Sequence, residues 1–284
     1  MRLLVTGASG FLGRRLCTLL RERHDIVGLY ASERPDISGM RWVRHRHTPG
    51  TSAAHLPDDV EGIVHLAQSA RYREFPEGAA DMYAVNVDFL FQLLEHARRC
   101  GGRAFVNTST GGVHDAAGGA LREDAGVRPR GFYPASKLAA EALCAPYESL
   151  VAVTSLRLFF IYGAGQAGRL IPNLAARIRD GQPIDLAGRA GGLCLTPTHA
   201  DDVVAVIEAA LAQAWQGTCN VAAPEVLSIE DIARALGGAL GIAPAFQRDG
   251  REEPEPLVPD LSLLRERFDI GRFRKFADCV ETLV

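Results

Sequence analysis

Lysine is almost absent from this chain. Only Lys137 and Lys275 occur among its 284 residues, and arginine makes up the rest of its 31 basic residues. Arginine therefore supplies positive charge wherever charge alone is enough. A lysine in such a chain points to chemistry that needs a compact ammonium group rather than a planar guanidinium.

Three further absences narrow the class of protein. The six cysteines form no Cys-x-x-Cys pair, which argues against a disulfide framework and favours reduced thiols in the cytoplasm. No apolar run approaches the roughly 20 residues that a membrane span needs. The formal net charge of -3 gives no electrostatic reason to expect a nucleic acid or an anionic membrane as partner.

A metal site has one weak candidate in the sequence. His45, His47 and His55 follow Trp42 in an arginine-rich segment. Alternating histidines of this kind are typical of a solvated strand face, so we expect no metal site.

Strand and helix patterns alternate through the first half of the chain. Short apolar runs alternate with segments whose apolar residues recur at helical spacing, as in Phe11–Leu20 and Asp81–Cys100. This alternation predicts an α/β fold, a Rossmann-type doubly wound parallel sheet covered on both faces.

The pattern of the sequence changes after Gly163. Segments become shorter, glycine and proline are frequent, and the alternation breaks down. We predict a dinucleotide-binding domain over residues 1–163 and a smaller C-terminal α/β substrate-binding region over residues 164–284, with segments that return to the Rossmann sheet.

A glycine-rich turn follows the first predicted strand. Gly7, Gly10 and Gly13 are spaced G-x-x-G-x-x-G and open a predicted helix. Gly7 permits a tight turn, Gly10 lets the backbone approach a pyrophosphate, and Gly13 lets the helix lie close to the sheet. This arrangement predicts a dinucleotide site that also includes Ser9, Phe11 and Leu12.

The end of the second predicted strand bears on the choice of dinucleotide. NAD sites usually place a carboxylate there, but this chain has Tyr30 followed by Ala31 and Ser32. Arg34, with Ser32 and Arg14, would suit the 2′-phosphate of NADP. The alternative is NAD, with Glu33 bound to the ribose.

Tyr133 and Lys137 lie four residues apart, on one face of a predicted helix. A phenol that titrates near pH 10 is a poor base at neutral pH, and a nearby ammonium lowers its pKa. The pair therefore predicts a general acid/base, with the lysine also reaching the nicotinamide ribose. A helix-capping tyrosine and a solvated lysine are the alternative.

Hydroxyl side chains end the fifth predicted strand. Thr108, Ser109 and Thr110 fall at the carboxyl edge of the sheet, where open α/β folds bind ligands. A hydroxyl there could hydrogen-bond the reacting oxygen of a substrate, although such residues are also common in turns.

Motifs along nearly the whole chain resemble the extended short-chain dehydrogenase/reductase family, often called NAD-dependent epimerases/dehydratases. They are Thr6–Gly13, Ile63–Ala67, Asn86, Val106–Val113, Tyr133–Lys137, Leu156–Arg157, Tyr162–Gly163, Ile184–Gly188, His199–Val203 and Asn220–Val221.

The resemblance implies a catalytic triad and a set of cofactor contacts. Thr110 would be the triad hydroxyl, with Ser109 next in line for that role and expected to contact the substrate. Tyr133 would be the general acid/base and Lys137 its electrostatic partner. Leu66, Ala67, Gln68 and Thr108 would line the cofactor. Many members act on nucleotide-activated sugars and dimerise through the helices that carry Asn86 and Tyr133, so a homodimer is expected.

The substrate pocket departs from the pattern of sugar-nucleotide epimerases. Phe160 stands where an asparagine is usual, and Leu195 lies near the place of a diphosphate-binding arginine, whereas Arg248 resembles a second such arginine. The main hypothesis is an NAD(P)-dependent reductase or dehydrogenase acting on a keto or hydroxy group of a sugar or sugar nucleotide. An epimerase with retained NAD and a non-catalytic dinucleotide sensor are the alternatives.

Overall fold

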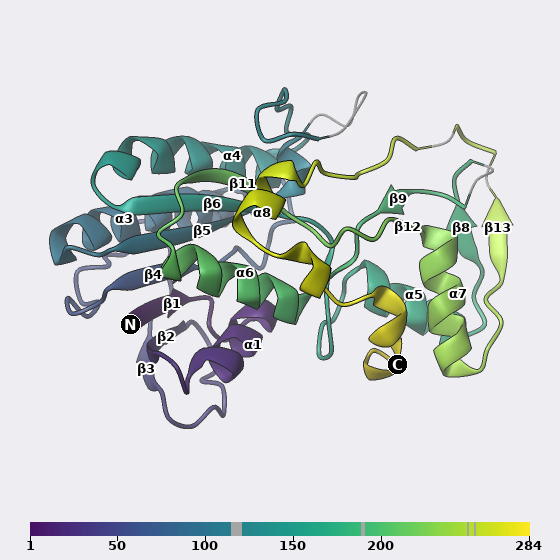
Figure 1. The fold of residues 1–284 in the computed structure, drawn as a ribbon, viewed down its shortest axis with the longest axis horizontal. Coiled ribbons are helices and arrows are strands. Elements are labelled where there is room, and N and C mark those ends of the chain that lie inside the picture. Colours follow the sequence, from purple (N-terminus) through teal and green to yellow (C-terminus); the bar gives the residue numbers. More distant parts are fainter. Residues whose placement is uncertain (115–120, 189–190, 249, 253) are drawn as a thin grey trace. The chain divides into compact units, whose positions relative to one another are not determined.

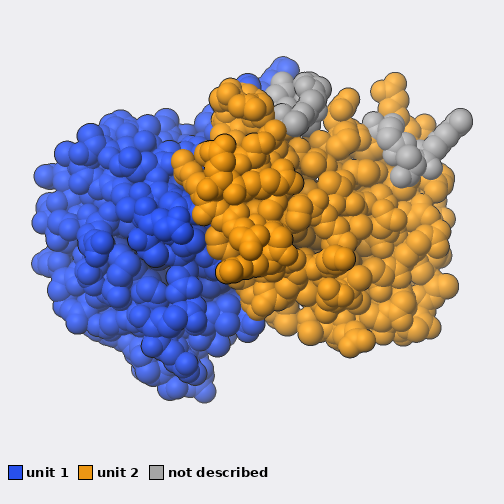
Figure 2. Space-filling model, viewed as in Figure 1, with its two compact units in different colours: residues 1–115, 126–158, 204–219 blue, residues 116–125, 159–203, 220–284 orange. Residues whose placement is uncertain are grey.

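The computed structural model describes residues 1–114, 121–188, 191–248, 250–252 and 254–284. The chain divides into two compact units, coloured in Figure 2. Unit 1 comprises residues 1–115, 126–158 and 204–219, and unit 2 comprises residues 116–125, 159–203 and 220–284. Each unit is built from several stretches of chain.

A seven-stranded sheet forms the centre of unit 1, and one end of its strand β11 belongs to unit 2. The strand order is β11-β6-β5-β4-β1-β2-β3, and the pairs from β3 through β6 are parallel. Read from the β3 edge, the first six strands follow the order 3-2-1-4-5-6, which is that of a Rossmann sheet. The predicted fold class is therefore confirmed. The strands are β1 (Arg2–Thr6), β2 (Asp25–Tyr30), β3 (Arg41–Arg44), β4 (Gly62–His65), β5 (Ala104–Thr110), β6 (Ala152–Leu158) and β11 (Gly217–Val221).

Helices cover both faces of this sheet (Figure 1). Helix α1 (Phe11–Leu20) packs against β2 on one face, while α3 (Phe89–Cys100) and α4 (Phe132–Cys144) contact β4, β5 and β6 on the other. Their buried residues recur every three to four positions, as in Leu90, Leu93, Leu94 and Ala97 of α3. Each helix therefore presents one apolar stripe to the sheet.

The helix expected over Asp81–Cys100 is interrupted. The chain runs from α2 (Ala79–Tyr83) through a π-helical stretch (Ala84–Asp88) into α3 without leaving the helical path. One extra residue per turn shifts the side chains of the π stretch relative to those of α3, and such bulges are frequent at functional sites. Asn86 lies within it.

Unit 2 has its own hydrophobic core. Tyr162, Ile171, Leu195, Leu236 and Phe276 are among its buried members. A separate cluster that includes Leu4, Ile63, Phe105 and Val153 fills unit 1. The elements named after β6, apart from β11, are β7 (Ile161–Tyr162), α5 (Leu170–Arg179), β8 (Ile184–Leu186), β9 (Cys194–Leu195), β10 (Thr198–His199), α6 (Ala200–Ala212, shared with unit 1), β12 (Leu227–Ser228), α7 (Ile229–Leu240), β13 (Phe246–Arg248) and α8 (Ser262–Arg267).

Short strands pair locally in unit 2. The pairs are β7 with β10, β9 with β12, and β8 with β13, each two to three residues long. Among the described residues, no helix has the length and apolar character needed to cross a membrane.

Candidate active site

The glycine-rich turn joins β1 to α1. Gly7 has a φ of +64°, and a Cβ there would lie 2.7 Å from the backbone nitrogen of Ala67. A Cβ at Gly13 would lie 2.1 Å from the carbonyl oxygen of Gly7. Both positions thus require glycine, one for its backbone conformation and both for close packing.

Helix α1 begins in a way that suits an anion. Gly10 is its N-cap, no side chain caps it, and its first turn contains no acidic residue. The first turn of α1 therefore places no carboxylate of its own at the positive end of the helix, which suits a phosphate. Ser9, Phe11 and Leu12 flank this N-terminus, and Arg14 donates from Nε to the carbonyl oxygen of Ser9 at 2.7 Å.

The residues expected to choose between NAD and NADP follow β2. Ser32, Glu33 and Arg34 are all exposed there, whereas Tyr30 packs edge-on against Trp42 with ring centroids 6.2 Å apart. Both a carboxylate and a guanidinium therefore lie within a few residues of the strand end.

Hydrogen bonds connect the carboxyl ends of β1, β4 and β5. The Thr6 hydroxyl contacts Nδ1 of His65 at 2.8 Å and accepts from the backbone N–H of Ala67 at 3.1 Å. The Thr108 hydroxyl donates to the carbonyl oxygen of His65 at 2.8 Å. These bonds position the backbone of Leu66 and Ala67 beside the glycine turn.

Lys137 is buried within unit 1. Its side chain extends from α4 to β5, where Nζ donates to the carbonyl oxygen of Thr108 at 3.0 Å, and the residue is only 2% exposed. Burial lowers the pKa of its ammonium to about 8, partly offset by the negative charge of Glu141. The structure thus brings together two residues that the sequence predicted as neighbours of the cofactor.

Tyr133 lies one helical turn before Lys137. Its hydroxyl donates to Oε1 of Gln68 at 3.1 Å, and its ring packs against Tyr72. Gln68, another predicted cofactor contact, therefore meets the predicted acid/base directly. Its amide oxygen is an acceptor that a substrate hydroxyl would have to replace.

The two hydroxyls of Ser109 and Thr110 have different surroundings. Ser109 is 5% exposed and donates to the carboxylate of Glu141. Thr110 is half-buried, and its oxygen accepts from the N–H of Gly112 at 3.2 Å, a bond in which the hydroxyl does not use its own proton and could still donate it to a ligand. This geometry favours Thr110 over Ser109 as the hydroxyl that meets a reacting oxygen.

Sequence reasoning gave no role to a buried ion pair beside these residues. Arg157 of β6 binds Glu141 of α4 through Nη2 at 2.7 Å and Nε at 3.0 Å, with both side chains at most 6% exposed. Arg157 Nη1 also lies 3.3 Å from Nε2 of His114. The spacing in the sequence could have indicated that Glu141 lies beside the catalytic pair, because Tyr133, Lys137 and Glu141 recur every four residues along one helix face.

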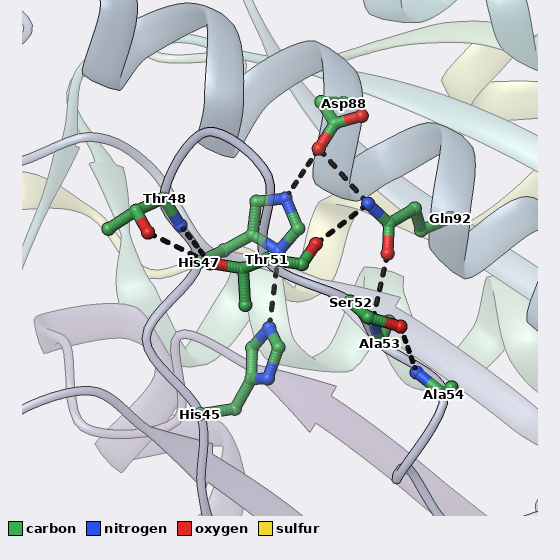
Figure 3. A network of polar contacts seen from close by, with 9 residues as sticks. All are labelled: His45, His47, Thr48, Thr51, Ser52, Ala53, Ala54, Asp88 and Gln92. Carbon is green, nitrogen blue, oxygen red and sulfur yellow. Dashed lines mark hydrogen bonds and ion pairs between the residues drawn. The ribbon is translucent and has the colours of Figure 1, made fainter.

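His45 and His47, unlike the exposed His55, do not lie on a solvated strand face, so for these two that expectation was wrong. His45 and His47 are 7% and 5% exposed and stack on Phe89. Figure 3 shows His45 bound to His47, whose Nε2 lies 2.7 Å from Asp88. Burial, with help from His47 and His55, lowers the pKa of His45 to about 4. Packing against α3 buried these rings, which periodicity alone did not reveal.

Three residues expected near the substrate belong to unit 2. Phe160 has a φ of +43°, rare for a residue with a side chain, and packs against the core of that unit. Leu195 is fully buried. Arg248 pairs with Glu230 at 3.0 Å and donates to the carbonyl oxygen of Gly188.

The chain matches known proteins along most of its length. The model of the NAD dependent epimerase/dehydratase family matches residues 3–222. A UDP-glucose 4-epimerase of Mycolicibacterium smegmatis is 30% identical, over 97% of this chain and 92% of that protein. An uncharacterised UDP-glucose epimerase of Bacillus subtilis is 29% identical, but the match spans only 58% of either protein.

A similar fold occurs among solved structures. UDP-glucuronic acid 4-epimerase of Bacillus cereus, determined in complex with UDP-glucuronic acid and NAD, superposes with a TM-score of 0.86. The superposition covers 99% of this chain and 97% of that one, at 24% identity. At this level of identity the likeness concerns the fold.

Proposed function

The chain belongs to the NAD dependent epimerase/dehydratase family, and on that premise we propose that it is a nucleotide-sugar epimerase that retains NAD. One observation carries the proposal. Tyr133 and Lys137 sit within hydrogen-bond reach of Gln68 and Thr108, at the sheet edge that also carries the glycine turn. The full-length similarity to a UDP-glucose 4-epimerase supports the substrate class.

Each residue has a defined task in such a reaction. NAD, when bound, supplies the acceptor and then the donor of the hydride. Tyr133 accepts the proton of the sugar hydroxyl as that carbon is oxidised and returns it when the carbon is reduced on its other face. The Lys137 ammonium favours the phenolate form of Tyr133, and the Thr110 hydroxyl donates to the sugar oxygen.

The cofactor in this proposal is NAD, with Glu33 as the candidate for the ribose hydroxyls. The preference for NADP, drawn from Ser32 and Arg34, finds no support in the comparisons, because the family description names NAD. The keto-sugar reductase interpretation has less support than the epimerase, because the relative that matches along nearly the whole chain is a UDP-glucose 4-epimerase. It becomes one outcome of the test.

A homodimer and a cytoplasmic location complete the proposal. Two large apolar residues on the α2–α3 helical segment, Tyr83 and Phe91, are 55% and 45% exposed, which suits a protein partner. The six cysteines are unpaired, as a reducing compartment requires.

Cofactor content and turnover test the function together. We expect freshly purified protein to release NAD on denaturation and to convert UDP-glucose to its 4-epimer with no net absorbance change of the nicotinamide. Rapid exchange with NADPH and stoichiometric oxidation of it would instead establish a reductase.

A pair of tyrosine variants tests the catalytic assignment. Tyr133→Phe should lower kcat by a factor of about 100 or more and leave NAD binding intact, because only the proton carrier is lost. Tyr147→Phe is the matched control, since its hydroxyl binds Glu95 at 2.6 Å, outside the proposed site. Near-normal turnover by Tyr133→Phe would refute the role of Tyr133.

A further inference from the structure

Gln68 extends from a fixed point of the backbone, just beyond the carboxyl end of β4. Its neighbour Ala67 donates its backbone N–H to the Thr6 hydroxyl at 3.1 Å. On the other side, Ser69 is buried and its hydroxyl donates to the carboxylate of Asp81. Both neighbours of Gln68 are therefore anchored within unit 1.

The hydrogen-bond partner of Gln68 is held as well. Tyr133 lies in the first turn of α4, and its ring packs edge-on against Tyr72 with ring centroids 5.4 Å apart. Its hydroxyl donates to Oε1 of Gln68 at 3.1 Å, and both residues are half-buried. Among the residues that the structure describes, the Gln68 side chain hydrogen-bonds to Tyr133 alone. Within that part of the chain, no second hydrogen bond holds the amide in one orientation.

The two protonation states of Tyr133 need different partners. A phenol donates its proton and needs an acceptor, whereas a phenolate only accepts and needs a donor. Lys137, one helical turn away, supplies positive charge, while its Nζ donates to the carbonyl oxygen of Thr108 at 3.0 Å. A side-chain amide carries an acceptor in Oε1 and two donor protons on Nε2. Gln68 can therefore serve either state of Tyr133.

We propose that Gln68 is a positioning residue that holds the Tyr133 oxygen in both protonation states by a half-turn of its amide. In the free enzyme, Oε1 accepts from the phenol. When the phenolate takes the proton of a sugar hydroxyl, Nε2 donates to the same phenolic oxygen. The half-turn places Nε2 where Oε1 was, and 3.1 Å lies within the range of an N–H···O hydrogen bond.

This role rests on the proposed function, since it takes Tyr133 as the general acid/base. The proton passes only between the sugar hydroxyl and Tyr133, and Gln68 neither gains nor loses one. Gln68 therefore acts through Tyr133, by keeping its oxygen in one place throughout the transfer.

Two substitutions of similar length separate the amide chemistry from simple packing. Gln68→Glu keeps the acceptor but, once ionised, offers no donor and repels a phenolate. Gln68→Met removes both the acceptor and the donor without adding charge. Because a hydrogen bond to an ionised group is about twice as strong as a neutral one, the loss of the donor outweighs the loss of the acceptor.

The pH at which Tyr133 forms a phenolate tests this role without any substrate. Near-ultraviolet phenolate absorbance is titrated in each protein, and the same titration with Tyr133→Phe added is subtracted. Gln68→Glu should raise the midpoint by at least about one pH unit, because the carboxylate disfavours the phenolate. Gln68→Met should raise it by roughly half a unit.

The pH profile of turnover distinguishes positioning from a structural effect. In Gln68→Met the acid limb of kcat/KM should move to higher pH and the maximum should fall about tenfold, while the alkaline limb stays in place. Gln92→Met is the matched control, because Gln92 is also half-buried but hydrogen-bonds to Thr51, Ala53 and Asp88 (Figure 3). It should leave the phenolate midpoint and the profile unchanged.

The outcomes separate this inference from the proposed function. An unchanged phenolate midpoint in Gln68→Glu, or a uniform loss of rate in Gln68→Met with an unmoved acid limb, would overturn the role of Gln68. If Gln68→Glu does not fold, as judged by its Tm, the midpoint of Gln68→Met decides in its place. A wild type without epimerase turnover would contradict the proposed function, whereas a shifted midpoint would still establish Gln68 as the partner of the Tyr133 oxygen.

Discussion

At the scale of single residues, Lys137 is the clearest case of a side chain whose pKa is changed by its surroundings. In a chain with two lysines, one is enclosed and bound to the carbonyl oxygen of Thr108. Burial disfavours the ammonium, and the pKa falls from 10.5 to about 8. An arginine would stay charged there and would not fit the same single acceptor.

This lowered pKa predicts an alkaline limit to activity. Lys137 is protonated below about pH 8 and loses its proton above it, so kcat/KM should fall as pH rises through about 8. Lys137→Gln should reduce turnover by a factor of about 100 or more and remove this limb from the profile. A profile that stays flat up to about pH 10 would contradict the role of the ammonium.

At the scale of elements, helix α4 carries both the proposed catalytic residues and the residue that attaches the helix to the sheet. Tyr133 and Lys137 face the predicted cofactor contacts, and Glu141, one turn further on, anchors the helix to Arg157 of β6. Glu141 also holds Ser109. One helix face thereby fixes both the catalytic pair and the strand end beneath it.

We expect the buried pair to be sensitive to loss of one partner. Glu141→Gln should lower the free energy of unfolding by about 3–5 kcal/mol, because Arg157 would remain as a buried charge without its carboxylate. The double variant Glu141→Gln/Arg157→Met should be less destabilised than the sum of the single variants. Denaturant unfolding measures all three.

An exposed pair provides the control for that cycle. Arg98 and Glu95 of α3 lie 2.9 Å apart with side chains 45% and 33% exposed. Arg98→Gln should cost less than about 1 kcal/mol. If Glu141→Gln costs no more than Arg98→Gln, the pair does not anchor α4.

At the scale of the whole molecule, cofactor binding should act on one unit. The glycine turn and the catalytic pair both belong to unit 1, whose core is distinct from that of unit 2. After removal of endogenous cofactor, NAD at 100 times its Kd should stabilise the folded protein by about 2.7 kcal/mol. Calorimetry with and without NAD measures the shift.

Two glycine variants identify where this stabilisation originates. Gly10→Ala places a Cβ 3.2 Å from the Gly7 carbonyl oxygen, where a pyrophosphate would approach, and should reduce the NAD-dependent rise in Tm. Gly238→Ala in α7 enters open space and should leave that rise unchanged. An equal NAD effect in Gly10→Ala would place the dinucleotide elsewhere.

The sequence by itself determined the fold class and the family. Strand and helix periodicity, the Gly7–Gly13 turn and the four-residue spacing of Tyr133 and Lys137 all depend on interactions within a few residues, which a sequence displays directly. The site assignments for Thr110, Tyr133 and Lys137 remain predictions with a consistent geometry.

Only the tertiary structure decided which residues from distant segments of the sequence contact one another. It buried His45 and His47 against α3, joined Glu141 to Arg157, directed Ser109 to a carboxylate, and brought Asp58 to His96 and Cys100. These contacts join residues up to 44 positions apart, as His45 and Phe89 are. No local pattern records them, because they arise when the sheet order places separate strands and helices side by side.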